Sequence, residues 1–233
     1  SDTMAARLRR EGIPAAKIRV IPNWADGEAI RPVEPAHNPL RRKWIGTDAF
    51  VVGYSGNMGR AHDLEPLLEA ARKLQDRNAS TPVRFLLVGE GFQARRLAGI
   101  VAENGLEHVT MRPFQPRQGL RHSLGVPDLH VVSLRPELEG LVVPSKIFGA
   151  LAAGRPVLYL GDRGSEIAAW LGKAGCGTAC APDDIDSIVD TVLAYARSPG
   201  RLAAEGHAAR ALFDERFSRD RALADWGEMI NHL

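Results

Sequence analysis

Short apolar segments alternate with amphipathic segments between about residue 50 and residue 195 of the 233-residue chain. Two of the amphipathic segments, 63–74 and 92–105, have apolar residues at helical spacing, and Asp63 is placed to cap the first. Continuous apolar strands joined by such helices predict a doubly wound, Rossmann-like α/β domain, with a parallel sheet covered by helices on both faces. The predicted strands are FVVGYSG (50–56), VRFLLVG (83–89), VTMRPF (109–114), LHVVSL (129–134), PVLYLG (156–161) and GTACAP (177–182).

The N-terminal part of the chain, 1–47, does not follow this alternation. Residues 1–12 predict a helix closed by glycine, and IRVIPNWAD (18–26) predicts a strand that leads into a loop. Three prolines then predict an irregular connector before a short helix at 40–45. We therefore expect a domain at 48–198 that is preceded by a connector.

The C-terminal part, 199–233, also lies outside the repeat. Two polar segments after Pro199, 201–216 and 219–233, predict helices. Such appendages are typical of a domain that reaches a neighbouring domain, so we expect these helices to contact another part of a larger protein.

Composition and charge narrow the class of protein. Hydrophobic residues make up 45% and charged residues 25%, the balance of an ordinary soluble globular protein. The net charge of +2 is spread along the chain, which does not indicate a nucleic-acid partner but leaves room for a local basic pocket. The apolar runs are shorter than the roughly 20 residues needed to span a bilayer. We expect a cytoplasmic protein and leave peripheral attachment to the inner face of a membrane open.

The two cysteines, Cys176 and Cys180 in GCGTAC, form a CxxxC pair. A bridge or a metal site is conceivable for such a pair, but zinc would need further ligands nearby. The seven histidines show no ligand spacing such as HExxH. We therefore expect two half-buried thiols on a strand, and neither a metal site nor a cofactor.

The loop YSGNMGRAHD (54–63) is the first candidate ligand site, because ligands bind beyond the carboxyl ends of strands in open parallel sheets. Gly56 and Gly59 permit a tight turn and close approach of the backbone to a ligand. Arg60 adds positive charge, and the following helix offers unpaired N–H groups to an anion. The loop lacks the full GxGxxG spacing, which disfavours a nicotinamide cofactor.

The second candidate site lies between residues 134 and 166. Pro144 opens a predicted helix with Ser145 and Lys146 in its first turn. A lysine there opposes the helix macrodipole, and an anion held between the lysine and the helix amides would reverse that conflict. The alternative is a solvated lysine tolerated at a small cost. Glu166, in GDRGSEIA, is placed either to contact the ligand or to cap its own helix.

The segment LEGLVVPSKIFGALAAGRPVL (138–158) resembles the signature of the retaining group-1 (family 4) glycosyltransferases, which share the two-domain GT-B fold. Five further segments agree in order and spacing: RVIPNWAD, VGYSGNMGR, LLVGEG, AGCG and AARALFDERFS. The resemblance covers nearly the whole chain but only the C-terminal, donor-binding half of such an enzyme. It implies that 1–47 is the interdomain crossover and that 199–233 packs back on an N-terminal acceptor domain. The chain alone is then expected to be inactive.

The resemblance also implies roles for individual residues. Glu139 matches the first acidic residue of the family motif and is expected at the donor sugar. Arg60 and Lys146 are expected to stabilise the departing diphosphate, which makes these three the implied catalytic residues. The implied donor contacts are Gly56, Asn57, Gly59 and Arg60 at the diphosphate, Arg112 and Phe114 at the nucleobase, and Gly140, Leu141, Val142, Ser145, Lys146, Gly149 and Glu166 around the ribose, the β-phosphate and the sugar.

Two positions depart from the family pattern. The second motif Glu, which grips the ribose, falls on Ile147 when counted from Glu139, and on Gly149 when aligned on the ALAAG helix end. Many members carry a lysine five residues after the loop arginine, where this chain has Glu65. Lys146 is a candidate to supply that charge, and the ribose contact stays open.

The resulting hypothesis is the donor-binding half of a glycosyltransferase. It moves a sugar from a UDP- or GDP-type nucleotide sugar to an acceptor with retention, in polysaccharide or glycoconjugate synthesis. The implied partners are the nucleotide sugar, the acceptor domain and a lipid-linked acceptor. Two rivals remain: a GT-B UDP-sugar epimerase, and a non-catalytic nucleotide-binding domain, which the loss of the second Glu favours.

Overall fold

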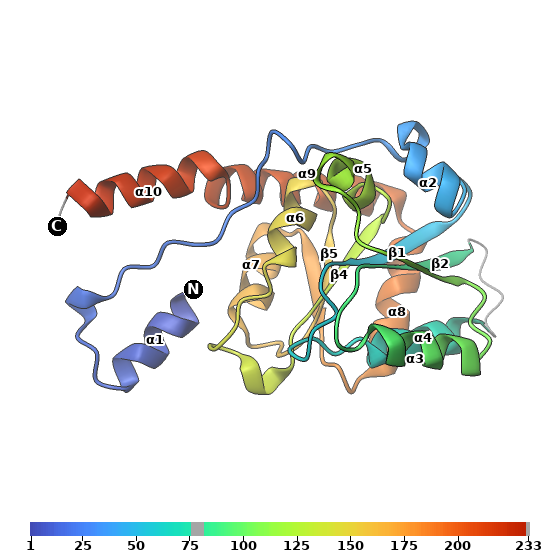
Figure 1. The fold of residues 1–233 in the computed structure, drawn as a ribbon, viewed down its shortest axis with the longest axis horizontal. Coiled ribbons are helices and arrows are strands. Elements are labelled where there is room, and N and C mark those ends of the chain that lie inside the picture. The colour runs from blue at the N-terminus through green and yellow to red at the C-terminus, as the bar shows by residue number, and fades with distance from the viewer. Residues whose placement is uncertain (76–81, 232–233) are drawn as a thin grey trace.

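The computed structural model describes residues 1–75 and 82–231, and these contain a six-stranded parallel sheet (Figure 1). The strand order is β3-β2-β1-β4-β5-β6, so the direction of winding reverses between β1 and β4. The strands are β1 Phe50–Ser55, β2 Val83–Val88, β3 Val109–Arg112, β4 Leu129–Ser133, β5 Val157–Leu160 and β6 Gly177–Cys180.

Helices cover both faces of the sheet, as the apolar strands predict. Alternate side chains of β1 enter different cores: Val52 and Tyr54 pack with α3, α4 and α8, whereas Val51 packs towards α2. A further core joins β4 and β5 to α6, α7 and α9. The doubly wound fold is therefore confirmed. The helices named here are α2 Pro39–Trp44, α3 Glu65–Gln75, α4 Ala94–Glu103, α6 Lys146–Ala152, α7 Glu166–Ala174, α8 Ile185–Ala196 and α9 Pro199–Arg216.

The predicted helices at the ends of the chain are present in the described residues. Helix α1 (Asp2–Arg10) is followed by Gly12 at φ +92°, and Ser1 caps it by accepting from the Met4 amide. After α9, helix α10 (Arg219–Asn231) occupies the last predicted helical segment, whose residues 232–233 lie outside the described range. The remaining elements are α5 (Leu120–Leu124) and 3-10 turns at Ala15–Lys17, Pro35–His37, Arg117–Gly119 and Pro136–Leu138.

The strand predicted over residues 18–26 is wrong. The segment makes one isolated bridge, Ala25 to Ser218, and otherwise runs past the sheet without joining it (Figure 1). A strand needs a neighbour for its backbone hydrogen bonds, and Pro22 lacks the N–H that a ladder would use. Val20, Ile21 and Pro22 of this segment instead line a hollow beside α7, described below.

Both cysteines are buried free thiols at β6. Cys176 precedes the strand and Cys180 is its last residue. Burial raises the pKa of Cys176 to about 11, which keeps it protonated and unreactive. The expected thiols are therefore present, more deeply buried than predicted.

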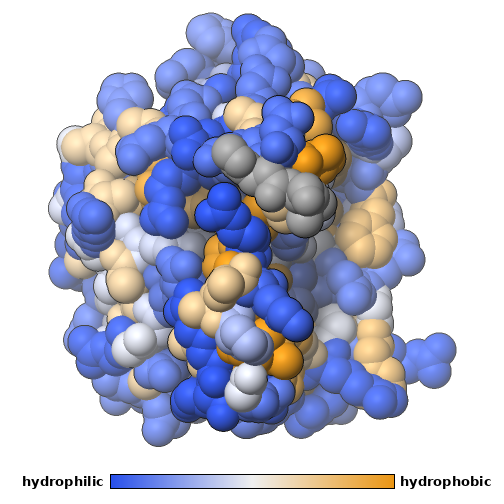
Figure 2. Space-filling model, turned by 90° about the vertical axis from the view of Figure 1, so that its left-hand side faces the viewer, coloured by the Kyte–Doolittle hydropathy of each residue, from blue (hydrophilic) through white to orange (hydrophobic). Residues whose placement is uncertain are grey.

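Helix α10 carries an exposed apolar stripe. Leu223, Trp226 and Ile230 are 51%, 44% and 61% exposed, and their spacing places them along one side of the helix. Figure 2 shows the end of the molecule towards which α10 extends, where a mainly hydrophilic surface is interrupted by apolar side chains. No helix of the described residues combines the length and hydropathy that crossing a membrane requires.

Candidate functional site

The loop of residues 56–62 turns its carbonyl groups towards the protein. Tyr54 Oη donates to the Asn57 carbonyl at 2.7 Å, and the backbone and side chain of Gln93 donate to three others. Arg135 donates from its amide to Ala61 and from Nε to Arg60, both at 3.0 Å. The carbonyls held in this way are those of Asn57, Met58, Gly59, Arg60, Ala61 and His62.

Several amide groups of the same loop are unpaired. Within the described residues, the N–H groups of Asn57, Gly59, Arg60 and Ala61 have no hydrogen-bond partner. A turn that presents several backbone N–H groups to solvent is a site for an anion. The carbonyl contacts hold this turn in place before any ligand binds.

Two glycines allow the loop to pack closely. Gly56 and Gly89 have φ values of +140° and +138°, which favour glycine. A Cβ atom on Gly89 would lie 2.1 Å from the Gly56 carbonyl oxygen, and one on Gly56 would lie 2.5 Å from Lys146 Cε. The absence of both side chains therefore lets the lysine stem lie directly on the loop.

Lys146 is the first residue of α6, and its ammonium group lies against this loop. Nζ is 2.7 Å from His62 Nε2 and 5.5 Å from the centre of the Tyr54 ring. Burial lowers the pKa of Lys146 to about 8. The structure thus brings together Lys146 and the glycine turn, two features that the sequence places about 90 residues apart.

His62 holds the lysine in place. Its Nδ1 lies 2.6 Å from the Ser133 carbonyl, an acceptor, so Nδ1 carries the hydrogen and Nε2 accepts from Lys146. Burial is the main cause that lowers the pKa of His62, and the positive charge of Lys146 acts in the same direction. The neutral imidazole is therefore the form that orients the ammonium group.

Sequence reasoning missed His62, Gln93 and Arg135. None belongs to a recognisable ligand pattern, and the contacts of Gln93 and Arg135 with the loop span 31 and 75 residues. The one available signal was the position of His62 within the predicted loop.

Glu139 directly follows the 3-10 turn Pro136–Leu138 and precedes α6 in the chain. Burial raises the pKa of its carboxyl group, and the negative charges of Asp162 and Glu166 act in the same direction, while a hydrogen bond from the Glu166 backbone opposes them. The partly buried carboxyl group of Glu139 is suited to a ligand that donates hydrogen bonds to it.

Glu166 neither caps its own helix nor lies free. Ser165 caps α7 by accepting from the Ala168 amide, so of the two roles left open for Glu166 the structure excludes the helix cap. The Glu166 carboxylate instead accepts from the amides of Asp2 and Thr3, at 3.0 and 3.2 Å. It therefore stabilises the start of α1.

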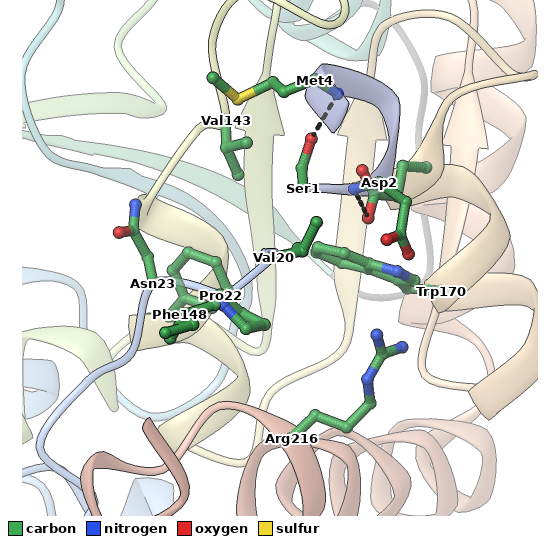
Figure 3. A pocket seen from close by; sticks show the side chains of 12 residues that line it. Ser1, Asp2, Met4, Val20, Pro22, Asn23, Val143, Phe148, Trp170 and Arg216 are labelled. Carbon is green, nitrogen blue, oxygen red and sulfur yellow. Dashed lines mark hydrogen bonds between the residues drawn. The ribbon is translucent and has the colours of Figure 1, made fainter. Parts of the chain in front are cut away.

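Figure 3 shows the hollow beside this contact, with a volume of about 320 Å³. The Trp170 indole and the Arg216 guanidinium border it, together with apolar side chains from the segment that was predicted as a strand. Its lining residues are Ser1, Asp2, Met4, Val20, Ile21, Pro22, Asn23, Val143, Phe148, Glu166, Trp170 and Arg216.

The predicted sugar contacts at Gly140, Leu141 and Val142 are only partly free. The amides of Leu141 and Val142 both donate to the Leu138 carbonyl, because the preceding 3-10 turn continues into them. Gly140, at φ +75°, has no partner for its amide in the described part of the chain. Of these three predicted sugar contacts, Gly140 is therefore the one that keeps a backbone donor for a ligand.

The structure distinguishes between the two positions, Ile147 and Gly149, that could match the second motif Glu. Ile147 is fully buried in the core between α6 and the sheet, so the position counted from Glu139 cannot face a ligand. Gly149 is partly exposed, and a Cβ atom there would lie 3.3 Å from Leu124. Ser145 precedes the helix without a side-chain capping bond.

Arg112, Phe114 and Arg60 are exposed at the same end of the sheet. Arg112 ends the edge strand β3, and Phe114, two residues later, is 50% exposed. The Arg60 guanidinium lies 4.1 Å from the centre of the Phe92 ring, and Arg60 lines a pocket from which Lys146 is absent. Its role at a diphosphate stays a prediction.

A family model described as "Glycosyl transferases group 1" matches residues 49–198, more than half of the chain. Two curated relatives have names that assign them provisionally as glycosyltransferases. WcaI of Escherichia coli (strain K12), named for colanic acid biosynthesis, is 26% identical over 81% of this chain and 46% of its own length. WbjE of Pseudomonas aeruginosa is 29% identical over 78% of this chain and 44% of its own length. The chain thus spans about half the length of these relatives.

Solved structures give the same fold. Sucrose-phosphate synthase from Thermosynechococcus elongatus superposes with a TM-score of 0.81 at 22% identity, over all of this chain and 56% of that one. Anabaena HepE, solved in complex with UDP and glucose, gives 0.80 at 19% identity, over 98% of this chain and 61% of that one. These neighbours are GT-B glycosyltransferases, and the chain corresponds to about half of each.

Proposed function

This chain belongs to the group 1 glycosyl transferases, and from that membership we propose that it forms the donor-binding half of a GT-B enzyme. Its ligand is a nucleotide-diphosphate sugar, whose sugar is moved to an acceptor, with retention, in glycoconjugate or polysaccharide synthesis. Two structural neighbours support a UDP-type donor, since HepE and S. aureus TarM were both solved in complex with UDP.

One observation carries this proposal. In the loop of residues 56–62, six carbonyls are engaged and four amides have no partner among the described residues. The Lys146 ammonium lies directly against this loop. Backbone N–H groups and a fixed cation are the groups that bind a diphosphate. The carboxyl-end edge at the β1/β4 reversal is also where open α/β sheets bind their ligands.

The same groups fit the chemistry of transfer. As the bond between sugar and diphosphate breaks, negative charge builds on the leaving diphosphate, and fixed donors stabilise that charge. Lys146 and the loop amides would fill this role from this chain. Glu139, next to Gly140 in the chain, would accept hydrogen bonds from sugar hydroxyls.

The acceptor side is proposed to come from a second domain. The exposed stripe on α10, Leu223, Trp226 and Ile230, is suited to bury against such a domain, because a large apolar stripe on a helix is normally covered. The coverage of about half of each relative agrees with this arrangement.

A non-catalytic nucleotide-binding domain is the second candidate. The specific observation in its favour is Gly149 at the position of the ribose-binding Glu, with Ile147 buried in the core. The two candidates differ in whether a protein that contains both domains turns the donor over.

The purified chain should bind UDP or GDP much more tightly than the matching nucleoside. Charge-assisted contacts to a phosphate contribute roughly 1.5–3 kcal/mol each, so the diphosphate should improve affinity by at least about tenfold. Calorimetric titration with UDP, GDP, uridine and guanosine tests this. Equal affinities for a nucleotide and its nucleoside would contradict the proposed diphosphate site.

Binding of the diphosphate should weaken as the pH rises above about 8. The free protein loses the Lys146 proton near that pH, because burial lowers its pKa to about 8, whereas a bound diphosphate would hold the proton. The facing His62 has a pKa below its usual range and stays neutral throughout, and burial keeps the Tyr54 phenol protonated because its pKa is strongly raised. Titrations with UDP from pH 7 to 9, in roughly half-unit steps, measure the slope.

The matched control for this slope is Lys146→Met, which keeps the length of the stem and removes the charge. It should bind UDP weakly and with little dependence on pH over the same range. An unchanged slope in Lys146→Met would assign the pH effect to another group.

A further inference from the structure

A second pocket, of about 570 Å³, lies at the same end of the sheet as the loop of residues 56–62. Its lining comes from three connections: Arg60 after β1, residues 92–96 after β2, and Arg135 after β4. The lining residues are Arg60, Phe92, Gln93, Arg95, Arg96 and Arg135. Neither Lys146 nor Glu139 belongs to it.

Four arginines around one pocket give it a strong positive charge. Two carboxylates lie within ion-pair distance, Glu65 at 2.8 Å from Arg96 and Asp63 at 3.8 Å from Arg135. No ion pair of the described residues involves Arg60 or Arg95. Four positive and two negative charges leave a surplus of two, which matches a doubly charged anion.

Several of the guanidinium groups are held in position. Arg135 Nε donates to the Arg60 carbonyl at 3.0 Å, and Arg135 Nη1 lies 3.8 Å from the Asp63 carboxylate, beyond hydrogen-bond distance. Arg60 stacks over the Phe92 ring, and Arg96 is oriented by Glu65. Guanidinium forks bind phosphate oxygens in pairs, and an arrangement that is already ordered loses less entropy on binding.

Phe92 adds an apolar wall to this basic pocket. Its side chain is 70% exposed even though one face of the ring is covered by Arg60. An exposed aromatic ring beside positive charge suits an organic ligand that carries a phosphate, since the ring can pack against carbon atoms next to the charged group.

We propose that this pocket is a second anion site, which binds a phosphate group that does not belong to the nucleotide sugar. The ligand class is a phosphate monoester or diphosphate, from a soluble molecule or from a lipid. If the bound phosphate belongs to the sugar acceptor, that role rests on the proposed function. The binding of phosphate to this pocket does not rest on it.

The test uses the chain saturated with UDP, so that the donor site is occupied. Calorimetric titration with inorganic pyrophosphate should then reveal a further binding event. Arg95→Gln and Arg96→Gln should each weaken it about tenfold, as expected for loss of one charge-assisted contact, and should leave UDP affinity unchanged. Arg135 is not substituted in this test, because it donates hydrogen bonds to the loop carbonyls of Arg60 and Ala61.

Arg84→Gln is the matched control, because Arg84 is exposed near the opposite end of β2 and should have no effect. Co-sedimentation with phosphatidylcholine vesicles, with and without phosphatidic acid, separates the two sources of the phosphate. Binding to pyrophosphate alone indicates a soluble ligand, and Arg95-dependent binding to phosphatidic acid indicates a lipid.

Two results would overturn the proposal. The first is no binding of either probe by the UDP-saturated chain. The second is a loss of UDP affinity in Arg95→Gln or Arg96→Gln as large as that in Lys146→Met, which would make the pocket part of the donor site. This second result would leave the proposed function intact, whereas a chain that binds no nucleotide would refute that function separately.

Discussion

The 233-residue chain is expected to bind UDP saturably. It is also expected to cleave a UDP-sugar no faster than the uncatalysed background reaction. The described residues form one parallel sheet, and its carboxyl-end edge would supply one wall of the proposed cleft. Holding two reactants in position lowers the reaction barrier by roughly 7–11 kcal/mol. A protein with one wall of the cleft holds only the donor and loses most of this reduction. The measurement is UDP release from a UDP-sugar, alongside calorimetric binding of UDP.

The comparison is the same chain joined to an acceptor domain, assayed with the same donor. Transfer by the two-domain protein, with retention at the anomeric carbon, supports the half-enzyme proposal. Comparable turnover by the 233-residue chain alone would contradict the half-enzyme proposal. Tight binding without turnover in the two-domain protein, with its own acceptor supplied, favours the non-catalytic binding domain.

Replacing Lys146 by methionine should weaken UDP by about tenfold or more and leave uridine almost unchanged. The ammonium group lies at the loop of residues 56–62, and one lost charge-assisted contact costs roughly 1.5–3 kcal/mol. The methionine keeps an apolar stem to pack on Gly56, so the loss reports the charge rather than a cavity. Calorimetric titrations of both ligands measure the difference.

Three variants control this result. Lys173→Met changes an exposed lysine on α7 and should have no effect. His62→Gln keeps an acceptor for the ammonium group and should bind UDP better than His62→Leu, which removes it. Equal losses for UDP and uridine in Lys146→Met would show that the lysine supports the fold rather than the phosphate.

Much of the candidate site could be predicted from local sequence. The glycine turn after β1 and the lysine at the start of α6 are features of short segments, and the structure places them in contact. Local sequence could not indicate that His62 receives the lysine, because that contact spans 84 residues. It also could not show that the Leu138 carbonyl accepts from the amides of Leu141 and Val142, which were predicted to contact the sugar. Those hydrogen bonds depend on the exact geometry of the turn.

The sequence by itself determined the doubly wound fold, because the alternation of apolar strands and amphipathic helices is dictated by which side chains must leave water. It also predicted the loops proposed to bind a ligand, since the carboxyl ends of the strands follow from strand direction. The tertiary structure decided which groups meet there. It placed Lys146 on Gly56 and His62, Glu166 on α1, and Arg60 among the arginines of a separate pocket. It also kept residues 18–26 out of the sheet. Such contacts depend on the packing of segments far apart in the chain, which hydrophobic periodicity does not encode.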